Sequence, residues 1–173
     1  YDFDKYDYTN IAGQFMKVSD VDKYKAEALK ENIHLFCGKE AEVEAINEAY
    51  TEDSLVAPIM VSCFDSMKAR KIFFNNWNSQ LDKEIFIDTR QNAENRDVFF
   101  VTPDKADEYL ESLVDDSEIG YETSCSYKAT SHTGAGTAEL VLVGLNNYLS
   151  NVLFAKEDNR EYETIRYFPF KVS

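Results

Sequence analysis

The sequence predicts an α/β domain whose sheet is mainly parallel, with an antiparallel part towards the C-terminus. The first reason is that strand-like and helix-like patterns alternate along most of the chain. The second is the nearly continuous apolar run at residues 55–64, LVAPIMVSCF, which has the length and hydrophobicity of a strand buried on both faces. The chain has 173 residues and neither an internal repeat nor a low-complexity linker, so residues 1–173 are predicted to form a single domain.

The amino-acid composition excludes several classes of protein. The apolar fraction of 44% fits a folded chain. The formal charge of −14 argues against binding to nucleic acid or to anionic membranes, because both surfaces repel a chain of this sign. No run approaches 18 apolar residues, so no membrane span is expected. Three widely spaced cysteines without a C-x-x-C pair make a disulfide framework or a cysteine zinc site improbable, and the expected compartment is the reducing cytoplasm.

The first half of the chain is predicted to place helices and strands on both sides of the strand at 55–64. A helix at 19–33 has a capping residue in Ser19 or Asp20 and apolar residues at helical spacing. The other elements predicted here are the end of a strand at 1–4, a short strand at 33–39, an acidic helix at 40–50 and a helix at 65–80.

The second half is predicted to begin with two strands and to end with one. These are the strands at 84–90 and 96–103, a helix at 103–114 with proline at its start, a long apolar helix at 137–155 and an edge strand at 162–170. The GAG sequence at 134–136 lacks the third glycine and the preceding strand of a phosphate loop. We therefore interpret it as the start of the long helix.

Two acidic residues are expected at the carboxyl ends of strands. Asp2 closes the first strand and Asp65 closes the strand at 55–64. In open α/β sheets ligands bind at these ends, and a carboxylate there can hold ribose hydroxyls or Mg²⁺. The alternative is that each aspartate caps the loop or helix that follows. The spacing of Asn10, Gln14 and Lys25 relative to the two aspartates favours the ligand-binding interpretation.

Four segments resemble the ThiF/MoeB/HesA group of ubiquitin-activating-like adenylyltransferases in order and spacing. They are DFD at 2–4, NIAGQF at 10–15, DKYKAEAL at 22–29 and SCFDSMKAR at 62–70. The resemblance implies a Rossmann-like three-layer domain. In that family a strand and a G-x-G-x-x-G loop precede the D-x-D motif, so we expect the chain to be N-terminally incomplete.

The resemblance also implies a reaction and a site. The C-terminal carboxylate of a small ubiquitin-like or sulfur-carrier protein would attack the α-phosphate of ATP, giving an acyl-adenylate and pyrophosphate. Asp2 would contact the ribose, Asn10 and Gln14 would line the phosphate side, Lys25 would meet the phosphates and Asp65 would bind Mg²⁺. A homodimer is the expected assembly. Many members bind zinc through two C-x-x-C pairs; this chain has none, so no zinc is predicted.

The chain departs from the family pattern at two positions. Gly13 replaces an arginine that can hold phosphate oxygens bidentately, and Ser66 replaces the asparagine after the magnesium aspartate. Arg90, at another strand end, is the favoured candidate to replace the lost charge. Arg70 matches an arginine that is common at its position, with a salt bridge as the alternative role.

Gly13 leaves two further functions open. One is a catalytically degenerate relative that serves as a binding or assembly module. The other is an NAD-dependent oxidoreductase, in which Asp2 would bind the NAD ribose.

Cysteine chemistry is a separate expectation. The family often places a cysteine before the long apolar helix, where it takes the activated acyl group or forms a persulfide, and Cys125 occupies that place. Lys128 would lower its pKa, and an inert thiol is the alternative. Cys37 and Cys63 lie in apolar patterns and are predicted to be core residues.

Overall fold

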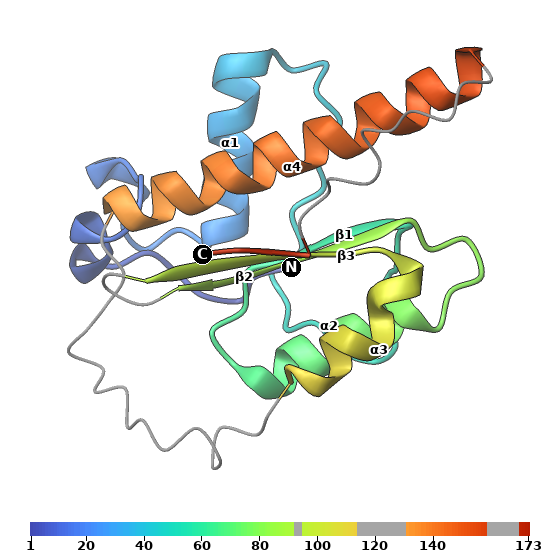
Figure 1. Cartoon of the computed structure of the whole chain (residues 1–173). Helices are drawn as coiled ribbons and strands as arrows, with labels where there is room; N and C mark the ends of the chain where they lie inside the picture. The colour runs from blue at the N-terminus through green and yellow to red at the C-terminus, as the bar shows by residue number, and fades with distance from the viewer. Residues whose placement is uncertain (92–94, 114–130, 159–169) are drawn as a thin grey trace. The chain divides into compact units, whose positions relative to one another are not determined.

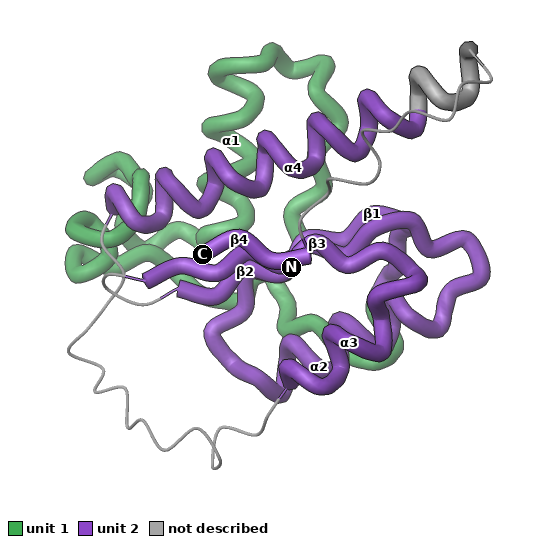
Figure 2. Tube along the Cα trace, in the orientation of Figure 1, with its two compact units in different colours: residues 1–54 green, residues 55–173 purple. Residues whose placement is uncertain are grey.

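The computed structural model describes residues 1–91, 95–113, 131–158 and 170–173 (Figure 1). These residues fall into two compact units, residues 1–54 and 55–173 (Figure 2). The prediction that the chain forms a single domain stays a prediction. No helix in the described ranges is long and apolar enough to cross a membrane.

The second unit is built on a mixed sheet with the strand order β1-β2-β3-β4. Strands β1 (Ile59–Ser62) and β2 (Ile85–Gln91) are parallel and joined by helix α2 (Met67–Asn78). Strand β3 (Arg96–Val101) is antiparallel to β2, since only residues 92–95 separate them and so short a connection permits no parallel crossover. The edge strand β4 (Lys171–Val172) is antiparallel to β3.

Helices cover both faces of this sheet (Figure 1). On one face, the ring of Phe86 in β2 packs against Phe74 and Trp77 of α2 and Tyr109 of α3 (Ala106–Glu111), with centroids 5.2–5.6 Å apart. The opposite face is covered by α4 (Ser131–Asp158). There Leu140, Val141, Leu145 and Tyr148 pack against Ile85, Ile87, Val98 and Phe100. Because side chains alternate along a strand, β2 is buried on both faces.

The first unit contains one helix and irregular backbone. Two short 3₁₀ turns, η1 (Tyr8–Ala12) and η2 (Val18–Asp20), precede helix α1 (Lys25–Cys37). A single bridge pairs Lys5 with Tyr24. The edge of the Tyr1 ring packs on Tyr50, 5.1 Å between centroids. Few apolar side chains of this unit are buried, Ala28 and Tyr50 among them.

Several predicted elements are present with shifted bounds. The strands at 55–64, 84–90 and 96–103 appear as β1, β2 and β3, and the helices at 19–33, 65–80 and 137–155 appear as α1, α2 and α4. The helix at 103–114 begins with a 3₁₀ turn, η3 (Pro103–Lys105), and continues as α3. The GAG segment lies inside α4, in agreement with its interpretation as a helix start. The edge strand at 162–170 falls almost wholly outside the described residues.

Four predictions about elements are wrong. The strand at 33–39 is helical through Cys37, since no helix-breaking residue intervenes before Gly38, whose φ of 90° ends the helix. The segment predicted as a helix at 40–50 is irregular, and the carbonyl of Ile46 there accepts the N–H of Asp2 in place of a helical donor. Residues 1–4 form no strand. The described sheet is not mainly parallel, since only β1 and β2 pair that way.

The prediction that Cys37 and Cys63 are core residues is also wrong, because both are exposed. Cys37 ends α1 and lies on its solvent side. Cys63 directly follows Ser62, the last residue of β1; it is exposed as a residue, although burial raises the pKa of its thiol.

Candidate functional site

The turn between β1 and α2 carries the one predicted magnesium ligand. Asp65 lies in this turn, after the carboxyl end of β1, and its side chain is exposed. The residue that caps α2 is Ser66, whose Oγ accepts a hydrogen bond from the N–H of Ala69 at 3.4 Å. The capping role considered for Asp65 therefore belongs to its neighbour. The Asp65 carboxylate faces solvent beyond the carboxyl end of β1, and α/β proteins bind ligands at the carboxyl ends of their strands.

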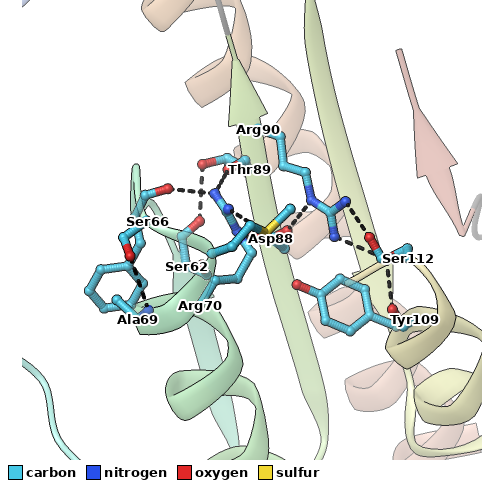
Figure 3. Close-up of polar contacts among 11 residues, drawn as sticks. Ser62, Ser66, Ala69, Arg70, Asp88, Thr89, Arg90, Tyr109 and Ser112 are labelled. Carbon is cyan, nitrogen blue, oxygen red and sulfur yellow. Dashed lines mark hydrogen bonds and ion pairs between the residues drawn. The ribbon is translucent and has the colours of Figure 1, made fainter. Parts of the chain in front are cut away.

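A buried charge cluster lies behind this turn, and Figure 3 shows it. Its members are Arg70 of α2 with Asp88 and Arg90 of β2, and we call it the Asp88 cluster. Asp88 is fully buried, and its two carboxylate oxygens bind different arginines. Oδ1 accepts from Nε of Arg70 at 2.7 Å, and Oδ2 accepts from Nε of Arg90 at 2.8 Å. The carboxylate is thus paired on both sides, as a buried charge must be.

Arg70 also binds two backbone carbonyls, one in the turn after β1 and one within β2. Its Nη2 donates to the carbonyl of Phe64, the residue before Asp65, and to the carbonyl of Thr89 in β2 at 3.1 Å. A planar guanidinium can serve several acceptors at fixed angles, which an ammonium group cannot do. One side chain therefore holds the turn of Asp65 against β2.

Arg90 is held on its other side by α3. Its Nη1 donates to the carbonyl of Ser112 at 3.1 Å, and its Nη2 donates to the Ser112 hydroxyl at 3.0 Å. The guanidinium carbon lies 4.3 Å from the ring centroid of Phe99. These contacts hold Arg90 in place within the protein, and its predicted contact with a ligand stays a prediction.

Tyr109 closes the cluster on the side of α3. Burial, reinforced by the negative charge of Asp88, raises the pKa of this phenol, and the nearby Arg90 opposes the rise. The hydroxyl is buried and has no hydrogen-bond partner among the described residues. Tyr109 therefore stays neutral in the physiological range, and the charge of the site comes from Asp88 and the two arginines.

In the first unit, two predicted ligand residues meet at Asp4. Oδ1 of Asp2 accepts a hydrogen bond from the N–H of Asp4 at 2.9 Å. Nζ of Lys25 lies 2.9 Å from Oδ2 of Asp4. Lys25 is the first residue of α1, and its own N–H donates to the carbonyl of Asp4 at 2.9 Å. The predicted ribose and phosphate ligands are therefore neighbours around one carboxylate.

Asn10 and Gln14 lie together at the turn η1. Oδ1 of Asn10 accepts from the N–H of Asp7 at 3.0 Å, and its carbonyl accepts from the N–H groups of Gly13 and Gln14. The Asn10 side chain thus shapes the turn. Gln14 is exposed. Gly13 has φ −114°, which other residues adopt readily, so its backbone does not require glycine.

The candidate residues are thus described in two groups. Asp2, Asn10, Gln14 and Lys25 lie in the first unit, and Asp65 and Arg90 lie in the second. Cys125 and Lys128 lie outside the described residues.

Sequence reasoning missed Asp88, the centre of the buried cluster. A signal was present, because a carboxylate inside the strand pattern EIFIDTR is unusual for a strand buried on both faces. The predicted alternative for Arg70, a salt bridge, is confirmed by its pairing with Asp88.

Asp65 offers one exposed carboxylate just beyond the carboxyl end of β1. In the described ranges no three His, Cys, Asp or Glu side chains are arranged to hold a metal. Magnesium in nucleotide sites needs only one or two carboxylates, because phosphates and water complete its coordination. The exposed carboxylate of Asp65 fits that requirement.

Comparisons of the chain with models of protein families, with curated proteins and with solved structures give no match.

Proposed function

We propose that the chain carries the adenylation site of an ATP-dependent adenylyltransferase of the ThiF/MoeB/HesA type. The substrate is the C-terminal carboxylate of a small ubiquitin-like or sulfur-carrier protein. The observation that carries the proposal is the exposed Asp65 in the turn of the parallel β1–α2–β2 unit. Helices on both faces of the sheet support a Rossmann-like three-layer arrangement, in which this edge binds nucleotides.

The chemistry relies on position and charge. Lys25 offsets the negative charge that develops on the α-phosphate, and its place at the start of α1 adds the positive end of the helix dipole. Asp2 accepts from the ribose hydroxyls, and Asn10 and Gln14 line the phosphate path. Asp65 holds the magnesium, which neutralises phosphate charge when ATP is bound. In the cell the protein acts in the cytoplasm as a homodimer.

A second candidate is a binding or assembly module that has lost catalysis. Two observations favour it: Gly13 stands where the family has arginine, and Lys25 is paired with Asp4. In this case the chain recognises the carrier protein without forming an adenylate.

Titration calorimetry of ATP with magnesium tests the proposal. We expect saturable binding to the wild-type protein, loss of binding in Asp65→Ala, and unchanged binding in the control Asp82→Asn, which removes an exposed carboxylate before β2. Pyrophosphate exchange with candidate carrier proteins then separates enzyme from module: exchange indicates the enzyme, and binding without exchange indicates the module. Absence of ATP binding contradicts the proposal, and binding of NAD in place of ATP would point to the oxidoreductase.

A further inference from the structure

Arg70 connects the residue before Asp65 to the strand beside it. Its side chain leaves α2, binds Asp88 and Thr89 of β2, and reaches the carbonyl of Phe64. Arg70 is only 5% exposed, so these contacts are shielded from water. In such surroundings hydrogen bonds from a charged donor are strong and directional.

Asp88, which binds Arg70, is itself held in place by neighbouring residues. Asp88 lies opposite Ser62 in the β1–β2 register, and Arg90 binds its second oxygen. Arg90 in turn is held by Ser112. The guanidinium of Arg70 therefore has one defined position, and the carbonyl of Phe64 is held at that position.

The far side of the turn is fixed as well. Ser66 caps α2, and its carbonyl accepts the N–H of Arg70 at 3.0 Å. Asp65 lies between these two anchored residues. Its backbone is thereby restrained on both sides while its side chain faces solvent.

We propose that Arg70 is a positioning residue for Asp65, acting through the carbonyl of Phe64 without touching the ligand. The inference rests on the proposed function, in which Asp65 holds magnesium with ATP. Residues that orient metal ligands change metal affinity by about ten- to hundredfold when they are altered. Loss of the Arg70 fork is expected to weaken the affinity for magnesium during nucleotide binding by a similar factor.

Two variants divide the contacts of Arg70 between them. Arg70→Lys keeps a cation beside Asp88 but lacks the planar fork, and Arg70→Gln keeps an N–H donor for a carbonyl but lacks the charge. If one variant does not fold, the other still tests the inference. The matched control is Lys68→Gln, which removes an exposed cation from the same helix.

The experiment uses two measurements on the full chain, below the melting temperature of each variant. One is the magnesium concentration that gives half-maximal ATP binding. The other, which needs no nucleotide, is the alkylation rate of Cys63, two residues before Asp65, measured by peptide mass spectrometry. Cys37, in the first unit, is the internal reference; both cysteines are exposed as residues, and burial raises the pKa of the Cys63 thiol, so a loosened turn should make it more reactive.

The expected result is a magnesium midpoint raised about tenfold or more in both arginine variants. Cys63 alkylation should become faster relative to Cys37, and Lys68→Gln should change neither quantity. A wild-type midpoint or a wild-type Cys63 rate in a folded arginine variant overturns the inference. If the wild-type protein binds no ATP, the proposed function has failed, and the Cys63 rate alone decides: faster alkylation supports the fixed turn, and an unchanged rate overturns it.

Discussion

Nε of Arg70 lies 2.7 Å from Oδ1 of Asp88, and both side chains are almost fully buried. Arg90 binds the other carboxylate oxygen, so a group with a net charge of +1 is enclosed beside the apolar core. Desolvation of such charges is costly and is offset only by good geometry and complete pairing. The cluster is therefore sensitive to the loss of any one member.

We predict that Asp88→Asn lowers the free energy of unfolding by about 3–5 kcal/mol, because the buried Arg70 and the partly buried Arg90 lose their shared counter-charge. The matched control is Asp97→Asn in β3, where the partner Lys171 is 40% exposed. Exposed pairs contribute at most about 1 kcal/mol. Urea denaturation followed by tryptophan fluorescence at Trp77 measures both variants. Equal losses would show that the Asp88 cluster adds nothing beyond a surface ion pair.

Two glycines of α4 give a second matched pair. A Cβ at Gly144 would lie 2.0 Å from Cε1 of the buried Phe100 ring, whereas a Cβ at Gly136 would meet the end of the Arg96 side chain, which can move away. We expect Gly144→Ala to destabilise the protein by about 1–3 kcal/mol through overpacking.

Gly136→Ala should be neutral or stabilising by up to about 1 kcal/mol, from helix propensity. Thermal unfolding of both variants is the measurement. If both substitutions destabilise the protein equally, the close approach of α4 to Phe100 at Gly144 is not the cause of the effect.

The fold was predictable where local pattern and tertiary environment agree. The run before Asp65 and the pattern EIFIDTR are apolar at strand length, and the structure uses both as neighbouring strands. The prediction failed at 33–39, where Ile33, Leu35 and Phe36 suit a short strand as well as a helix. Hydrophobic periodicity over seven residues cannot distinguish a strand from a helix. In the structure helix α1 continues through Cys37, so this segment is helical.

The site was predictable only in part, for a similar reason. Asp65 could be placed at a sheet edge, since chain order and strand direction determine that position. The Asp88 cluster could not, because its three members are 2 to 20 residues apart and meet only through the register of β1, β2 and α2. The pairing of Lys25 with Asp4 likewise depends on the bridge between Lys5 and Tyr24, which no sequence signal marked.

Asp20 gives a prediction about pH. Burial alone would raise its pKa, but the N–H of Lys17 and the charges of Lys17 and Lys23 overcome this effect and lower the pKa below the ordinary value. Between the folded pKa and the higher unfolded pKa of Asp20, the folded protein thus binds fewer protons than the unfolded chain. The stabilisation is present above the unfolded pKa of about 3.9 and is lost as the pH falls through the folded value.

The experiment compares wild type with Asp20→Asn by urea denaturation between pH 3 and pH 6. We expect the difference in unfolding free energy to be larger at pH 6 and to shrink below about pH 4. The control is Asp53→Asn, an exposed residue of the first unit. A difference that stays constant across this range would contradict a lowered pKa for Asp20.

The contact of Lys25 with Asp4 leads to the last prediction. If Lys25 meets phosphates, ATP must compete with the Asp4 carboxylate, which lies 2.9 Å from Nζ and is 54% exposed. Asp4→Asn removes the competing charge and leaves the backbone contact of the two residues in place. Because such a pair is worth about 0.2–1 kcal/mol, the affinity for magnesium–ATP should rise by a factor of about 1.4 to 5.

The matched control is Glu31→Gln, which releases Lys23 from its pair on the same unit and should leave ATP affinity unchanged. Calorimetry at two salt concentrations measures both variants. The gain from Asp4→Asn should shrink at high salt, because the competing ion pair is already screened there. A loss of affinity would instead mean that Asp4 orients Lys25 for the phosphate. An equal gain in both variants would mean that only net charge matters and that Lys25 has no specific role.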